Sequence, residues 1–269
     1  MPNPSLGPDR GRKPKGPPSR TPTRRPPVRP TARPSSRTAG PQGPPRKPER
    51  SAKPGPRPKD LTREWFDELR DTARPDGQDE LMALVTKALE SFGENDYARA
   101  SSLAKQAKTR APRSGRLREL LGLAYYHSGN WTEAASELLT YRRLTGDIDQ
   151  NHVIADCYRA AGRFDRALEV CDEVDRKRVS DEVWTEVTIV AAGALADKGD
   201  IDQALARLAR GELKPAAVEP HHLRLWYVRA DLLDRSGRQQ EAKDLWELIL
   251  GEAGEFYDVD ERLNAVARP

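Results

Sequence analysis

Cysteine is scarce in this sequence, and no long apolar run occurs. Only two cysteines, Cys157 and Cys171, are found in 269 residues, which excludes a disulfide framework. The longest nearly uncharged apolar run, residues 187–196, is about half as long as the roughly 20 residues of a membrane-spanning helix. The N-terminus does not reach the apolar segment of about 7 to 15 residues that a secretory signal requires. We therefore expect a cytoplasmic protein without a membrane span, whose two thiols are reduced and buried.

Enzymatic motifs are absent as well. The sequence has no phosphate-binding loop, no dinucleotide-binding glycine pattern, no nucleophile elbow and no His-Glu-x-x-His pair. Cys157 and Cys171 lack the second cysteine pair that would complete a zinc site. We therefore predict a non-enzymatic protein with no catalytic residues, no metal and no cofactor.

Two other polar clusters have simple structural explanations. His221 and His222 are adjacent, so they point to different faces of a helix, and we expect solvated or capping side chains. Asp258, Asp260 and Glu261 lie at an expected helix start, where acids complement the helix dipole.

Proline and charge divide the chain into two segments. Residues 1–60 hold 18 of the 23 prolines and 16 Lys or Arg against three acids, a local net charge of 16 − 3 = +13. Residues 61–269 hold the other 30 basic and 39 acidic residues, a net charge of −9. A segment so poor in apolar residues cannot bury enough surface to offset its ordering entropy. We expect residues 1–60 to be a disordered basic arm and residues 61–269 to fold.

Helical spacing begins directly after this arm. Asp60 is a candidate N-cap, and Leu61, Trp65 and Leu69 form an apolar stripe at i, i+4 and i+8. The segment Arg74-Pro75-Asp76-Gly77 is typical of a turn, so the spacing predicts a helix over 61–74. A short helix over about 256–268 is predicted to cover the other end of the domain.

Between these two helices, over about residues 81–250, alanine recurs at intervals of 34, 33, 37 and 38 residues, at Ala100, Ala134, Ala167, Ala204 and Ala242. A turn-type segment with Gly or Asn precedes each of these alanines, as Gly129 does before Ala134. Each unit has the pattern of a helix, a turn and a second helix. The repeat predicts an all-α protein of about five helical hairpins.

The repeat period and the recurring turn residues resemble those of the tetratricopeptide repeat (TPR). In the second unit, the residues that fall where the family has Leu-Gly, Tyr, Gly, an aromatic, Ala and a large apolar residue are Leu121-Gly122, Tyr125, Gly129, Trp131, Ala134 and Leu138. Residues 118–168 are similar to a group of uncharacterised actinobacterial TPR proteins that also have a basic, Pro-rich N-terminus. The resemblance implies a right-handed α-solenoid in which the first helix of each hairpin lines a concave groove.

Residues on the face of those first helices that points away from the second helix, and that would line the groove, are our candidate partner-binding set. They are Arg116, Glu119, Leu123, Tyr126, His127, His152, Asp156, Arg159, Arg224, Tyr227 and Asp231. Tyr and Arg carry a disproportionate share of binding energy at protein interfaces, so this mixture favours a protein or peptide ligand. A solvated helix face with intramolecular ion pairs is the alternative. Glu119 and Leu123 stand where a carboxylate-clamp TPR domain has Lys and Asn, which argues against that mode of binding.

Two functions therefore stay open at this point. The first is a protein–protein interaction scaffold or adaptor that binds its partner in the groove. The second is a nucleic-acid or ribosome-associated factor whose cationic arm contacts phosphates in a strongly salt-dependent way. An arm that acts only as a linker is equally compatible with the composition, and neither the partner nor the oligomeric state follows from the sequence.

Overall fold

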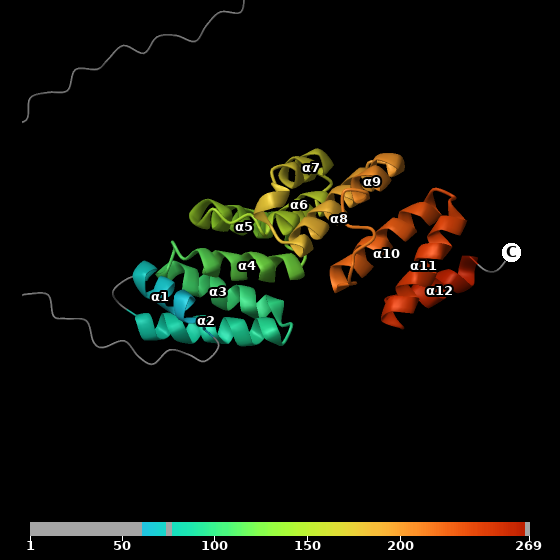
Figure 1. Cartoon of the computed structure of the whole chain (residues 1–269). Helices are drawn as coiled ribbons and strands as arrows, with labels where there is room; N and C mark the ends of the chain where they lie inside the picture. The colour runs from blue at the N-terminus through green and yellow to red at the C-terminus, as the bar shows by residue number, and fades with distance from the viewer. Residues whose placement is uncertain (1–60, 74–76, 267–269) are drawn as a thin grey trace, which may run out of the picture. The chain divides into compact units, whose positions relative to one another are not determined.

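The computed structural model describes residues 61–73 and 77–266, and the predicted arm lies outside them. Regular structure in the described residues is helical, with twelve α-helices and one 3-10 turn (Figure 1). The first of these helices is α1 (Arg63–Thr72), the last is α12 (Val259–Val266), and the 3-10 turn is η1 (Arg176–Arg178).

The other ten helices form five hairpins, as the sequence predicts. The pairs are α2 (Gln78–Gly93) with α3 (Tyr97–Arg110), α4 (Gly115–His127) with α5 (Trp131–Thr145), α6 (Asn151–Ala160) with α7 (Phe164–Asp172), α8 (Asp181–Asp197) with α9 (Ile201–Leu208), and α10 (Pro220–Arg235) with α11 (Gln239–Ala253). Successive hairpins pack through α3 on α4, α5 on α6, and α7 on α8, and α10 packs on both α8 and α9. Each hairpin thus buries its faces against its neighbours along the chain, which is the architecture of a solenoid.

All five hairpin turns share one backbone geometry. The turn residues Asn95, Gly129, Gly162, Gly199 and Gly237 have φ values between 60° and 94°. The N–H of the following residue donates to a carbonyl five positions back, as between residues 130 and 125 at 2.9 Å. This is the Schellman arrangement, whose left-handed position favours Gly and tolerates Asn. The recurring Gly or Asn in the sequence is therefore a requirement of the turn.

The five recurring alanines lie in the hairpin core. Each of them is completely buried at the start of the second helix of its hairpin. A methyl side chain allows the two helices to approach closely, and a larger side chain at this position would meet the facing helix. The alanine period and the turn period therefore describe the same structural unit.

At the N-terminal end of the described residues, α1 is fixed by one carboxylate. Thr62, and not Asp60, accepts the capping hydrogen bond, from Trp65 N at 3.3 Å, and Asp60 lies outside the described residues. The side chain of Glu68 accepts from Gly115 N at 2.6 Å, at the N-terminus of α4. Exposed N–H groups at that end of a helix carry a partial positive charge, so the carboxylate is well placed there.

At the other end, α12 begins at Val259, three residues later than the helix predicted from about residue 256. Val259 is completely buried, and α12 packs on α11.

The connection between the fourth and fifth hairpins, residues 209–219, is held by two tryptophans. The indole N–H of Trp184 donates to Arg210 O, and that of Trp226 donates to Leu213 O, both at 3.2 Å. Both bonds satisfy carbonyls of an irregular segment that has no helical partner for them.

His221 and His222 lie at the start of α10, directly after this connection. Both side chains are buried, so the prediction of solvated histidines is wrong. The alternative of a capping role is confirmed for His222, whose Nδ1 accepts from Glu219 N at 3.0 Å in a capping box. Pro220 directly before them is a residue favoured at the first turn of a helix.

The alanine positions give a test of the repeat. Replacing Ala134 by Leu should force α4 and α5 apart, and overpacking of this kind costs about 1 to 3 kcal/mol of unfolding free energy. The same substitution at Ser102, which is exposed on α3, should leave the melting temperature nearly unchanged. Thermal denaturation of both variants measures the difference, and equal melting temperatures would contradict the repeat alignment.

Candidate partner-binding groove

The candidate residues occur at constant distances from the hairpin turns. Leu123, Asp156 and Asp231 each stand six residues before the turn glycine of their hairpin. Tyr126 and Arg159 each stand three residues before it. Residues three or four positions apart lie on one side of a helix, so α4, α6 and α10 present these positions on a common face.

Contacts between α4 and the region of α6 support this for three candidates, Tyr126, Asp156 and Glu119. The phenol of Tyr126 donates to Asp156 Oδ2 at 2.7 Å. The side-chain amide of Gln150, just before α6, donates to Glu119 Oε1 at 2.9 Å. Each bond joins the second hairpin to the third.

The same face continues from α6 to α8 through Arg159. Its Nε donates to Asp156 Oδ1 at 2.7 Å, and its Nη1 donates to Asp197 Oδ2 at 2.8 Å. Tyr126, Asp156, Arg159 and Asp197 therefore form one chain of hydrogen bonds across three hairpins. We call these four residues the inter-hairpin ladder.

Similar bonds join α8, α10 and α12. Arg224 Nε donates to Glu186 Oε1 at 2.7 Å, and the Tyr227 phenol donates to Asp258 Oδ1 at 2.6 Å. Asp231 accepts from Arg262 Nη1 at 2.9 Å. Seven of the eleven candidates therefore make a hydrogen bond to another hairpin or to the segment beside it.

The other four candidates lie differently. Arg116 is exposed and Leu123 is half-buried. His127 is exposed and stacks on the ring of Tyr97, with ring centres 4.5 Å apart. His152 is partly buried, with its Nδ1 2.8 Å from the carbonyl of residue 149.

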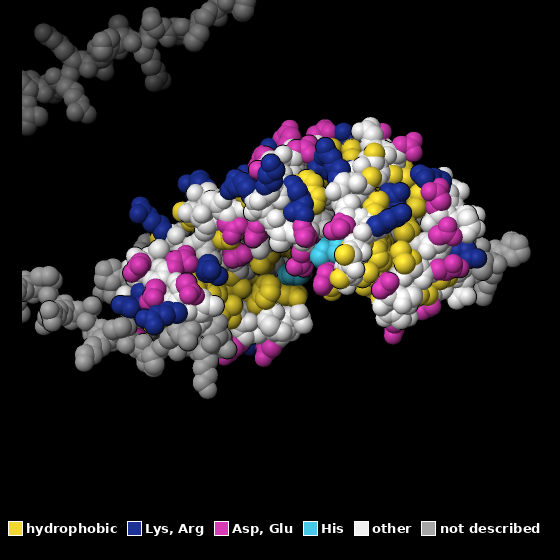
Figure 2. All heavy atoms as spheres, in the orientation of Figure 1, with side chains coloured by type: hydrophobic (Ala, Val, Ile, Leu, Met, Phe, Trp, Pro, Cys, Tyr) yellow, Lys and Arg dark blue, Asp and Glu magenta, His cyan; other side chains and the backbone are white. Residues whose placement is uncertain are grey.

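Around His127, aromatic rings of the first two hairpins form a cluster. Tyr126 contacts both His127 and Trp131 edge to face, and Phe92 contacts Tyr97 and His127 in the same way. In Figure 2, hydrophobic side chains gather where α3 meets α4. This end of the common face is therefore apolar, in contrast to the charged pairs of α6, α8 and α10.

Sequence reasoning assigned no groove residue to the fourth hairpin. Counting six residues back from Gly199 reaches Gly193, and counting ten back reaches Ile189, the same distances at which Asp156 and His152 stand from Gly162. The register of the turns could therefore have identified these α8 positions.

The α8 residues form the floor of a hollow of about 220 Å³ between α6, α8 and α10. Its lining residues are Asp156, Arg159, Ile189, Val190, Gly193, Ala196, Asp197, Val228, Asp231, Leu232 and Arg235. We call it the α8 pocket. It brings together three sequence candidates, Asp156, Arg159 and Asp231, with side chains that the sequence analysis did not select.

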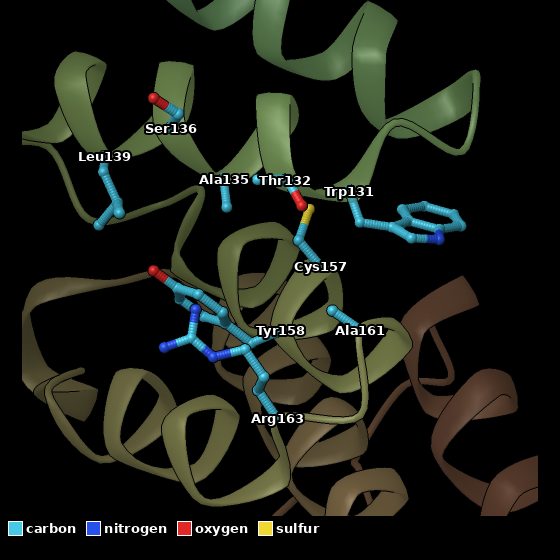
Figure 3. A pocket seen from close by; sticks show the side chains of 9 residues that line it. All are labelled: Trp131, Thr132, Ala135, Ser136, Leu139, Cys157, Tyr158, Ala161 and Arg163. Atoms are coloured by element: carbon cyan, nitrogen blue, oxygen red, sulfur yellow. The ribbon is translucent and has the colours of Figure 1, made fainter.

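A second cavity, also of about 220 Å³, lies between α5 and α6 (Figure 3). Trp131, Leu139 and Tyr158 are among its lining residues, and the guanidinium of Arg163 lies 4.9 Å from the centre of the Tyr158 ring. Cys157 also lines it, and burial raises the pKa of that thiol to about 12. Burial has the same effect on Cys171, so both thiols are protonated near neutral pH and are poor nucleophiles.

Burial also changes two ionisable candidates of the groove. It raises the pKa of Glu119 above its ordinary value, although the hydrogen bond from Gln150 acts in the opposite direction. It lowers the pKa of His152, because the charged imidazolium loses hydration. His152 is thus a neutral side chain at physiological pH, and it offers no positive charge to a partner.

Within residues 61–73 and 77–266, no group of three or more His, Cys, Asp and Glu side chains is arranged to hold a metal ion. In the same part of the chain, no helix has the length and apolar character needed to cross a membrane.

The ladder predicts a difference between two aspartates. Asp156→Ala removes the acceptor of both Tyr126 and Arg159, and hydrogen bonds to a charged group are worth about 1.5 to 3 kcal/mol each. Asp165→Ala removes an ion pair with Lys198 in which the aspartate is 83 % exposed, and such pairs contribute little. Chemical denaturation should show a clear loss of stability for Asp156→Ala alone, whereas equal losses would show that the ladder does not hold the hairpins together.

Glu119 gives a prediction with a definite pH dependence. A carboxyl whose pKa is raised by folding makes a contribution to stability that is present at low pH and is lost as pH rises through the raised value. Glu119→Gln replaces the ionisable carboxyl, so this pH-dependent loss of stability no longer occurs, and the new amide oxygen still accepts from Gln150. The variant should melt above the wild type at neutral pH, and its advantage should fade as pH falls toward the ordinary carboxyl pKa of 4.5. Glu90→Gln, on an exposed part of α2, is the control; a variant that melts below the wild type at neutral pH would contradict this assignment.

Comparison with known proteins identifies the repeat. Residues 85–147 match the family model of the tetratricopeptide repeat. No curated protein matches the sequence. Among solved structures, a thermophilic TPR protein of Thermus thermophilus is 18 % identical with a TM-score of 0.54, over 69 % of this chain and 98 % of the other.

Two further structures share the fold. The apo form of the quorum sensor NprR of B. thuringiensis is 16 % identical with a TM-score of 0.59, over 75 % of this chain and 62 % of its own. A kinesin light chain-type protein of Podospora anserina with nearly identical TPR-like repeats is 18 % identical with a TM-score of 0.51, over 72 % of this chain and all of the other. A tetratricopeptide repeat is thus recognised at residues 85–147, in the first two hairpins, and the described residues have the fold of a TPR-like solenoid.

Proposed function

We propose that the chain is an interaction scaffold that binds a protein or peptide partner on the face shared by α4, α6, α8 and α10. The observation that carries this proposal is the α8 pocket, a hollow on that face with an apolar floor and charged walls. Solenoids offer extended surfaces of this kind, and their repeated helices hold the side chains in a fixed register. The apolar patch around Leu123 and His127 extends the same face toward the first hairpin.

The residues offered to the partner are those that the inter-hairpin bonds leave available. Arg116 and His127 are exposed on α4, and Leu123 is half-buried between them. Val190 and Val228 are half-buried on α8 and α10, where they line the pocket. Tyr126, Arg159 and Asp231 act first as links between hairpins, so their replacement would disturb the surface as well as any contact.

A second candidate function rests on the charge of residues 1–60, which lie outside the described residues. Sixteen Lys or Arg against three acids would bind a polyanion such as RNA without reading its sequence. The two functions make opposite predictions for a chain that lacks this segment.

Site-specific cross-linking tests the proposed groove. A photo-reactive amino acid at position 123 or 228 should cross-link to a partner captured from native cell extract. The same group at Arg143 or Glu247, exposed on the second helices α5 and α11, should not. Each variant is prepared with and without residues 1–60. Groove cross-links that persist when the arm is deleted support the scaffold. If deleting the arm abolishes all capture, and capture by the full-length chain weakens with added salt, binding is assigned to the arm.

A further inference from the structure

The α8 pocket differs from its counterparts because of one residue. Six residues before the turn, the second, third and fifth hairpins carry Leu123, Asp156 and Asp231, and the fourth carries Gly193. The missing side chain leaves the hollow open between α6 and α10. A Cβ at Gly193 would meet only the side chain of Arg159, at 3.4 Å, so the fold does not require glycine here.

The size of the pocket limits its occupant. Small-molecule sites have volumes of about 300 to 1,000 Å³, whereas this hollow has about 220 Å³ and opens to solvent. It is therefore suited to one side chain of a larger partner. Its floor and one wall are aliphatic, formed by Ile189, Val190, Val228 and Leu232.

The charged groups around the opening come from all three helices. α6 contributes Asp156 and Arg159, α8 contributes Asp197, and α10 contributes Asp231 and Arg235. Three carboxylates thus face two guanidinium groups. The guanidinium of Arg159 is already engaged, because its Nε and Nη1 donate to Asp156 and Asp197.

The carboxylates keep unused acceptor capacity. An ionised carboxylate has about four lone-pair sites. The side chain of Asp197 is 37 % exposed and accepts from Arg159. Asp231 accepts from Arg262 at 2.9 Å and has a longer contact of 3.6 Å with Arg235. Arg159, Arg235 and Arg262 already contact these carboxylates; a further cation would gain their remaining acceptor sites, whereas a carboxylate would meet three like charges.

We infer that the α8 pocket is a subsite for one long cationic side chain, arginine or lysine, of an extended basic partner peptide, an inference that rests on the proposed function. The methylene stem of such a side chain packs on the aliphatic wall while its charged end stays at the solvent-facing carboxylates. Arginine suits the site better than lysine, because its planar group can donate to two carboxylates at once.

Blocked pentapeptides with a single variable central residue are the probes. The central residue is arginine, norleucine or glutamate between alanines, and binding to the full-length, isotope-labelled chain is followed by the amide resonances of Val190 and Val228. The arginine peptide should shift both resonances in a saturable way and bind about tenfold more tightly than the norleucine peptide. Its affinity should fall with added salt, because the charges at the opening are solvated. The glutamate peptide should leave both resonances in place.

Gly193 supplies a variant that separates binding from folding. Gly193→Leu should fill the hollow and abolish the arginine-dependent shifts. Gly193→Ala should raise the melting temperature, since alanine is the better helix former, and should weaken binding. Gly251→Ala, in α11 with open space around its Cβ, is the matched control and should bind normally.

Two results would overturn the inference. One is the absence of any shift at Val190 and Val228 with the arginine peptide at millimolar concentration. The other is an equal response to the arginine and glutamate peptides. Either result would leave the cross-linking test of the groove untouched, so failure of the subsite is distinguishable from failure of the proposed function.

Discussion

The left-handed residue in each hairpin turn is the constraint on which the rest of the structure depends. It ends the first helix, and its Schellman bonds fix where the second helix starts. Because helices are rigid, every position on the first helix then stands at a set distance from the turn. Asn95 occupies this position in the first hairpin, which shows that the requirement is for the conformation and not for glycine alone. The core alanines and the common face of α4, α6, α8 and α10 both follow from this register.

The common face has two tasks that compete for the same side chains. Tyr126, Asp156, Arg159 and Asp197 bind hairpin to hairpin, and they also border the surface proposed for a partner. Truncating one of them would change the spacing of two hairpins as well as one contact. A partner that donates a hydrogen bond to Asp156 or Asp197 must leave the bonds from Arg159 intact or replace them. Binding at this face is therefore linked to the rigidity of the third and fourth hairpins.

Much of the fold could be predicted from sequence because its determinants are local. The turns, the buried alanines and the stripe Leu61, Trp65 and Leu69 depend on residues a few positions apart. The pairing of the groove residues could not be predicted, because the partner of Tyr126 is 30 residues away and no local pattern distinguishes Asp156 from other acids. Gly193 was missed since a small residue carries no chemical signal, and only its distance from Gly199 gives it a place. The role of His222 depends on the entry into α10, where local composition suits solvated and buried side chains alike.

Two of the five tryptophans donate their indole N–H to the same connection between the fourth and fifth hairpins. Trp184 approaches it from α8 and Trp226 from α10, so the segment is held from both sides. An indole that loses a hydrogen bond and gains water changes its fluorescence emission. The fluorescence of Trp184 and Trp226 therefore reports on the state of the connection. Release of this segment, whether by a partner that pulls on α10 or by partial unfolding of the last hairpin, would be visible without any added label.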